Sequence, residues 1–182
     1  MKSFKLFRGL LLMFCCLSSL AIVSCDNDND DPVPSNAKDV LGDYTGTIAV
    51  NNNNDAIGVK IDKNVAISDF PTKEIVKSVV ATENQEEALK SLKEVTYSID
   101  YKASATDKTI TLTLNPKTLS FEMTVKGKQQ KVDVTFTSSA TGSYSITDKS
   151  LAFTLKAESV SIDGTKASSF NAMNFALSAK KK

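Results

Sequence analysis

The strongest constraint on the fold is a period-two alternation of apolar and polar side chains that dominates from Asp39 onward. In the clearest case, residues 118–126, leucine, phenylalanine, methionine and valine alternate with polar residues. Successive side chains of a strand point to opposite faces, so this pattern predicts strands with one buried and one solvated face. The same alternation recurs in 95–101, 110–114, 132–136 and 151–155. Parallel sheets show continuous apolar runs instead, so we expect an antiparallel sheet.

Turn-forming pairs separate these stretches at hairpin distance. They are Asp107-Lys108, Asn115-Pro116, Gly127-Lys128, Thr141-Gly142, Asp148-Lys149 and Asp163-Gly164. Short connections join antiparallel neighbours, so the predicted fold class is mainly β, an antiparallel meander that closes as a barrel or folds as a sandwich. The alternation also predicts that three phenylalanines are buried while their neighbours face solvent: Phe121, Phe136 and Phe153 against Glu122, Thr135 and Thr154.

Helix is expected only in residues 71–93, as two short helices over about 72–80 and 83–93. Pro71 suits the first position of a helix, and Thr82 with Gln85 forms a capping-box pattern for the second helix. We expect these helices to cover one end or one face of the sheet. A fixed plug that closes the core is favoured over a moving lid above a ligand cavity.

Residues 1–24 have the three parts of a secretory signal: a basic start, an apolar stretch and a small residue, Ser24, before Cys25. The apolar stretch is short of the about 20 residues that a membrane-spanning helix needs. A cysteine at this position is typical of bacterial lipoproteins, whose thiol receives a lipid. We therefore expect Cys25 to be lipidated and to hold the protein at a membrane.

Residues 25–37 form a predicted tether that follows the lipidated cysteine and is rich in aspartate and asparagine. Such a composition buries too little apolar surface to fold. The acidic run Asp26–Asp31 resembles the export signal of surface lipoproteins of the Bacteroidetes, and a solvated spacer is the alternative. The predicted location is the outer membrane, facing the cell surface, with residues 38–182 forming a single all-β domain.

Composition excludes several classes of function. Loss of Lys2, Lys5 and Arg8 with the signal leaves 19 lysines against 21 acidic residues, with no arginine, histidine or tryptophan. Histidine is the commonest general base and a leading metal ligand, and arginine is the usual clamp for phosphate. We therefore expect no metal, no cofactor, no nucleic-acid partner and no hydrolase of the serine–histidine type.

The start of the all-β domain carries a family resemblance. The run Leu41-Gly42-Asp43-Tyr44-Thr45-Gly46-Thr47 resembles the first strand of the uncharacterised lipocalin-like or calycin-like lipoprotein domains of gut Bacteroidetes, and Asp69-Phe70-Pro71 ahead of a helix is similar to one such family of unknown function. The resemblance implies a lipocalin-like barrel. Lipocalins place a tryptophan where Tyr44 stands and pack an arginine from a late strand against it, and this chain has neither after its signal.

Three classes of function remain open. The first is a non-catalytic module that binds a small apolar molecule or a glycan, for which the candidate residues are Tyr44, Tyr97, Tyr101 and Phe70. The second is a structural lipoprotein that contacts a protein partner of the cell envelope. The third is an enzyme with paired carboxylates, which we do not expect because the candidate carboxylates fall on predicted solvated faces: Glu94, Asp100, Glu122, Asp133 and Glu158.

Overall fold

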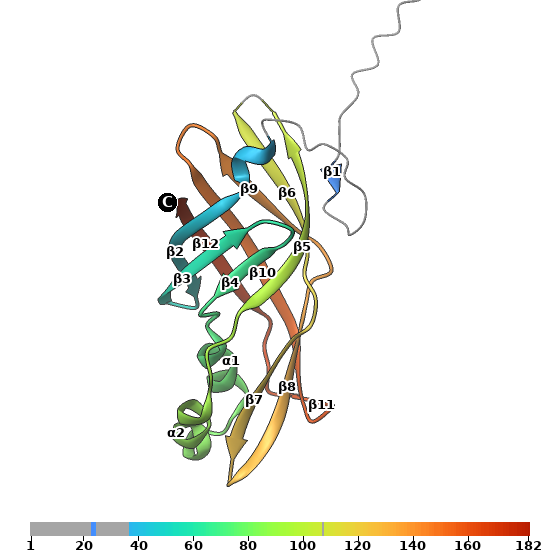
Figure 1. The fold of residues 1–182 in the computed structure, drawn as a ribbon. Coiled ribbons are helices and arrows are strands. Elements are labelled where there is room, and N and C mark those ends of the chain that lie inside the picture. The colour runs from blue at the N-terminus through green and yellow to red at the C-terminus, as the bar shows by residue number, and fades with distance from the viewer. Residues whose placement is uncertain (1–22, 25–36, 107) are drawn as a thin grey trace, which may run out of the picture.

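The computed structural model describes residues 23–24, 37–106 and 108–182. Cys25 and the acidic run lie outside them, as do most of the predicted signal peptide and Asp107 of one predicted turn. The described part of the chain is built mainly of strands, with two short helices at one end (Figure 1).

The elements follow one another along the chain with short connections. The strands are β1 (Val23–Ser24), β2 (Gly42–Val50), β3 (Asn53–Ile61), β4 (Val65–Ser68), β5 (Tyr97–Ala105), β6 (Thr109–Asn115), β7 (Leu119–Val125), β8 (Lys128–Phe136), β9 (Ala140–Ser145), β10 (Ser150–Ile162), β11 (Thr165–Lys166) and β12 (Met173–Lys181). The helical elements are the 3-10 turn η1 (Ala37–Val40) and the α-helices α1 (Thr72–Val79) and α2 (Thr82–Ser91).

Eight antiparallel strands form a closed barrel. Their order is β12-β2-β3-β4-β5-β6-β9-β10, and β10 pairs with β12 to complete the ring. Strands β2 to β6 are a meander, as predicted. The structure therefore selects the barrel over the sandwich, the choice that the sequence pattern left open.

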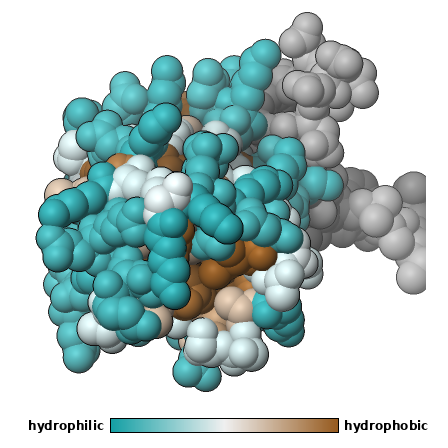
Figure 2. All heavy atoms as spheres, turned by 90° about the horizontal axis from the view of Figure 1, so that it is seen from below, coloured by the Kyte–Doolittle hydropathy of each residue, from teal (hydrophilic) through white to brown (hydrophobic). Residues whose placement is uncertain are grey.

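The β7–β8 hairpin is an extension of the sheet beyond the barrel. Strand β10 is long enough to pair with β9 along its first half and with β8 along its second, and the register shifts between Ala157 and Ser159. The hairpin therefore continues below the barrel, where α1 and α2 lie beside it (Figure 1). Seen from that end, apolar side chains are visible inside a hydrophilic rim (Figure 2).

The predicted faces of the strands are confirmed. Phe121, Phe136 and Phe153 are 7%, 4% and 5% exposed, whereas the polar neighbours Glu122, Thr135 and Thr154 are exposed. At the end of the barrel near the helices, four aromatic rings pack together with centroids 5.0–6.1 Å apart. They belong to Phe70, Tyr97, Phe136 and Phe175.

The opposite end of the barrel is closed by η1 and by two tyrosines. The Tyr44 hydroxyl donates to the Val40 carbonyl, and the Tyr44 ring meets the edge of Tyr144 at 6.0 Å. Lys181 of the last strand donates to the Asp39 carbonyl at 2.6 Å and lies 6.0 Å from the centre of the Tyr144 ring. Tyrosine and lysine thus close this end in a chain that lacks the tryptophan and arginine of lipocalins.

The two helices are confirmed, but the capping box is wrong. Helix α2 begins at Thr82 itself and has no side-chain cap. The Gln85 amide instead donates to the carbonyls of Lys77 and Val80, at 3.0 and 2.9 Å, and so ties α2 to the end of α1. Pro71 precedes the first helical residue of α1. Neither helix, nor any other within the described residues, is long and apolar enough to cross a bilayer.

One predicted turn is also wrong. Thr141-Gly142 lies inside β9, where Gly142 pairs with Phe153 of β10. A Cβ atom at Gly142 would come within 3.1 Å of the Phe153 Cβ, so the glycine permits close approach of two strands rather than a reversal of the chain. The turns at 148–149 and 163–164 are confirmed, with positive φ at Lys149 and Gly164.

Candidate functional site

The four aromatic candidates for ligand binding lie in the core. Tyr44, Tyr97, Tyr101 and Phe70 are each 3% exposed or less. The structure brings Phe70 and Tyr97 together, with ring centroids 5.3 Å apart, and places Tyr44 at the other end of the barrel. These side chains are packed in the core, and a ligand role for them stays a prediction.

Their hydroxyl groups have backbone partners. Tyr97 donates to the Lys117 carbonyl at 2.6 Å, and Tyr101 donates to the Asp62 carbonyl at 2.9 Å. Burial raises the pKa of the Tyr44 and Tyr97 hydroxyls, because the charged form would lose its water. These groups are therefore neutral hydrogen-bond donors at physiological pH.

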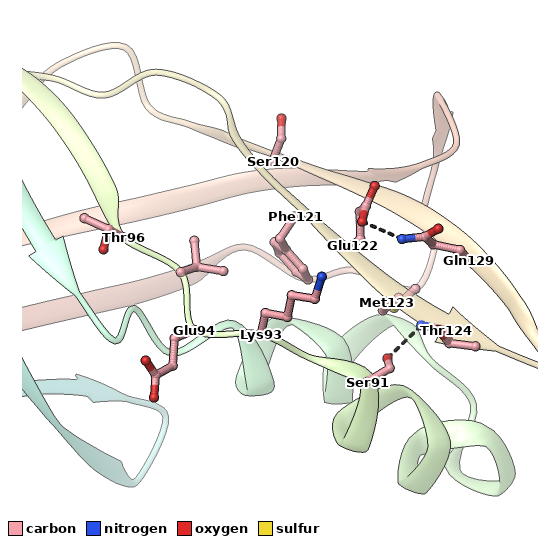
Figure 3. Close-up of a pocket in the computed structure, with 11 residues that line it drawn as sticks. Ser91, Lys93, Glu94, Thr96, Ser120, Phe121, Glu122, Met123, Thr124 and Gln129 are labelled. Atoms are coloured by element: carbon pink, nitrogen blue, oxygen red, sulfur yellow. Dashed lines mark hydrogen bonds between the residues drawn. The ribbon is translucent and has the colours of Figure 1, made fainter.

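A pocket of about 360 Å³ lies outside the barrel, between β7 and the extended segment 92–96 that joins α2 to β5. We call it the β7 groove, and Figure 3 shows its residues. They are Ser91, Lys93, Glu94, Val95, Thr96, Ser120, Phe121, Glu122, Met123, Thr124 and Gln129. Its volume is within the range of small-ligand sites.

Two hydrogen bonds bridge the walls of the groove, one at each end. At the α2 end, the Thr124 backbone N–H donates to the Ser91 hydroxyl oxygen at 2.7 Å. At the barrel end, the Tyr97 hydroxyl donates to the Lys117 carbonyl at 2.6 Å. Segment 92–96 is thus held to the β7 region at both ends and is separated from the strand by the groove between them (Figure 3).

The groove has an apolar and a polar side because β7 alternates. Phe121 and Met123 face inward, whereas Ser120 and Glu122 face outward and are exposed. Glu122 accepts a hydrogen bond from the Gln129 amide. Phe121 lies in the middle of the close-up, beside Lys93 (Figure 3). The groove therefore offers an apolar contact and several hydrogen-bonding groups within one short strand.

On the polar face of the β7–β8 hairpin, Asp133 contacts two neighbouring side chains. Its carboxylate accepts from the Ser120 hydroxyl at 2.5 Å and lies 3.0 Å from the Lys131 ammonium. The Ser120 hydroxyl, followed by the Lys131 ammonium, holds the pKa of Asp133 below its usual value. Asp133 is therefore an anion at neutral pH on the same sheet face as Glu122.

An acidic surface along α2 adjoins the groove. It is lined by Glu83, Glu86, Glu87, Lys90, Ser91 and Thr124, of which Ser91 and Thr124 also line the β7 groove. Glu87 holds the hairpin in place, because its two oxygens accept from the backbone N–H groups of Lys126 at 2.7 Å and Gly127 at 2.9 Å. Lys90 is paired with Glu86 at 2.5 Å. The adjoining surface is therefore net negative.

Over residues 37–106 and 108–182, no group of three or more histidine, cysteine or carboxylate side chains is placed to hold a metal ion. Sequence reasoning missed the groove, although it put Glu122 on a solvated face. No local pattern marked the groove, because its walls come from segments that are remote in the sequence.

Comparison with known proteins gives a family but no activity. Neither the curated proteins nor the solved structures include a match to this chain. A family model, described as a domain of unknown function (DUF4840), matches residues 39–162. The matched range runs from η1 to the end of β10 and includes both walls of the β7 groove. The chain therefore belongs to the DUF4840 family of domains of unknown function.

Proposed function

We propose that this protein is a non-catalytic binding module, anchored by lipid on Cys25 in the outer membrane and displayed at the cell surface, with its ligand site in the β7 groove. The observation that carries the proposal is the groove itself, a pocket of about 360 Å³ beside a barrel whose candidate aromatic residues are buried. We therefore place recognition outside the barrel.

The chemistry of the groove fits two ligand classes. Phe121, which is 7% exposed, supplies an apolar contact for a small apolar molecule or for the face of a sugar ring. Lys93, Glu94 and Gln129 supply donors and acceptors for hydroxyl groups. A protein partner of the cell envelope is the second candidate, and the edge position of β7 favours it.

A ligand screen on the full chain, purified in mild detergent, tests the site. Thermal shift against glycans, bile acids, fatty acids and haem gives candidate ligands, and Thr96→Arg then blocks the groove. Thr113→Arg is the matched control, because Thr113 is an exposed residue of β6 outside the groove. We expect Thr96→Arg to abolish the shift and Thr113→Arg to retain it. A ligand that binds both variants equally would place the site elsewhere.

The anchor is tested separately. Cys25→Ala should release the protein from membranes into the soluble fraction, because the cysteine is the predicted site of lipidation. Full retention of the variant in the membrane fraction would show that another feature anchors the protein.

Surface display is tested by neutralising the acidic run. Asp28, Asp30 and Asp31 changed together to alanine should leave lipidation intact and reduce cleavage by an external protease on intact cells. Equal cleavage of both proteins would reduce the run to a spacer.

A further inference from the structure

Strand β7 is the last strand of the sheet. It pairs with β8 on one side, and its other edge has no strand partner among the described residues. An open edge presents a row of backbone N–H and C=O groups that can pair with another extended chain. The β7 groove runs along this open edge.

The hydrogen bonds around the hairpin show which backbone groups face the groove. Glu122 lies opposite Lys131 in the ladder, but the Lys131 N–H and C=O bond the side chain and backbone of Asp163 instead, each at 2.9 Å. Thr124, two residues from Glu122, directs its N–H away from β8 to Ser91. Because alternate residues of an antiparallel strand face the same edge, the N–H and C=O of Ser120 and Glu122 point into the groove.

The groove has the form of a vacant strand position. The Ser91–Thr124 bond lies at one end of the groove and the Tyr97–Lys117 bond at the other, and Ser91 and Tyr97 flank segment 92–96, the opposite wall. The groove therefore has room for a short extended segment. Between the bridges, Ser120 and Glu122 repeat the same pair of backbone groups every two residues, or about 7 Å. This spacing matches the backbone repeat of an extended peptide.

We propose that the β7 groove binds an extended, basic peptide segment of a partner protein, which adds as a strand to the open edge of β7. The inference rests on the proposed function in that it uses the same groove, and it specifies the partner as a peptide. In such strand addition the backbone supplies affinity, and alternate side chains supply specificity.

The side chains of β7 define the pattern of the bound peptide. Residues opposite Glu122 would share its outward face, so basic side chains there form favourable cross-strand pairs. Residues on the other face of the added strand would meet Phe121 and Met123, so apolar side chains belong there. The acidic surface of α2 that adjoins the groove favours positive charge as well. A peptide with alternating basic and apolar residues satisfies all three features.

Charge also distinguishes a partner peptide from a second copy of this chain. A symmetric pairing of β7 with β7 centred on Glu122 would set two glutamates opposite each other, and like charges opposite each other destabilise a sheet. That register is therefore disfavoured for a second copy, whereas a basic strand complements Glu122 in the same register.

The test titrates the full chain, in mild detergent, with a four-residue peptide of alternating lysine and valine, which is short enough to lie between the two bridges. Backbone amide signals are followed by nuclear magnetic resonance. We expect saturable binding with the largest changes at Ser120 and Glu122. The same peptide with N-methylated lysine amides should bind more weakly by about tenfold or more, because the methyl groups remove the hydrogen bonds to β7. A glutamate–valine peptide should also bind more weakly.

Glu122→Pro supplies the matching change in the protein, with Glu122→Ala as its control. Proline removes an N–H that faces the groove and leaves the ladder to β8 intact, which edge strands tolerate. We expect Glu122→Pro to weaken binding about tenfold and Glu122→Ala to weaken it only a few-fold. Ser120→Pro serves the same purpose if circular dichroism shows that Glu122→Pro is unfolded.

Three results would overturn the inference. Equal binding of the N-methylated peptide would exclude strand addition. A concentration-dependent dimer in sedimentation, lost in Glu122→Pro, would identify a second copy as the occupant. A glycan or apolar ligand whose binding depends on Thr96, with no peptide binding, would refute the peptide while leaving the proposed function in place.

Discussion

Phe136→Ala is the substitution that most sharply tests whether the barrel interior is packed. The Phe136 side chain is 4% exposed, and its ring contacts three others, at centroid distances of 5.0 Å to Tyr97, 6.1 Å to Phe70 and 6.0 Å to Phe175. Truncation of a buried phenylalanine costs about 3–5 kcal/mol, and loss of three ring contacts places Phe136 toward the upper end. That is a large part of the about 5–15 kcal/mol that stabilises a typical domain.

The assay is urea unfolding of the full chain in detergent, followed by circular dichroism, with Thr135→Ala as the control. Thr135 is exposed on the opposite face of β8, so its truncation should change stability by no more than about 0.5 kcal/mol. The two variants should share one denaturant slope and differ in midpoint. A loss below about 2 kcal/mol for Phe136→Ala would mean that the ring does not fill a packed interior, and a larger loss for Thr135→Ala would mean that the faces are exchanged.

Three further predictions concern the hairpin, the tyrosines and metal dependence. Glu87→Gln should speed hydrogen exchange of the amides in the β7–β8 turn, because Glu87 accepts hydrogen bonds from two of them, whereas Glu86→Gln should not. Equal exchange rates in the two variants would show that Glu87 does not hold the turn. Burial raises the pKa of Tyr44 and Tyr97 above the value of about 10 that tyrosine has in the unfolded chain, so their contribution to the free energy of unfolding should be constant below pH 10 and fall as the pH rises above it. The fall should be less steep in Tyr44→Phe, and a flat profile from pH 10 to 12 would refute this. The melting temperature should be the same with and without a chelator, because the chain has no histidine; a lower value with chelator would reveal a structural metal.

Sequence reasoning found the interior because alternation is a local property. Phe121, Phe136 and Phe153 were each assigned to the buried face from their immediate neighbours, and all three are buried. The same local reasoning failed at Thr141-Gly142. Gly142 is a strand residue that packs closely against Phe153 of the neighbouring strand, and residues near Gly142 in the sequence do not show that contact. Closure of the barrel likewise depends on pairing of β10 with β12, which short-range patterns do not encode.

The groove could not be predicted, because it depends on the pairing of remote segments. Its end bridges join Ser91 to Thr124 and Tyr97 to Lys117, across 33 and 20 residues of sequence. An unpaired edge also depends on which strands are neighbours, and the pattern of β7 is the same whether its edge is covered or open. For a similar reason, the alternation put Tyr97 on an apolar face without showing whether it lines a cavity or fills one.

Amide hydrogen exchange along β7 tests the central claim most directly, since that claim is an open strand edge facing the groove. The N–H groups of Phe121 and Met123 face β8, whereas those of Ser120 and Glu122 face the groove. We predict slow exchange at Phe121 and Met123 and fast exchange at Ser120 and Glu122 in the free protein. Slow exchange at all four positions would show that the edge of β7 is already paired and would contradict the account.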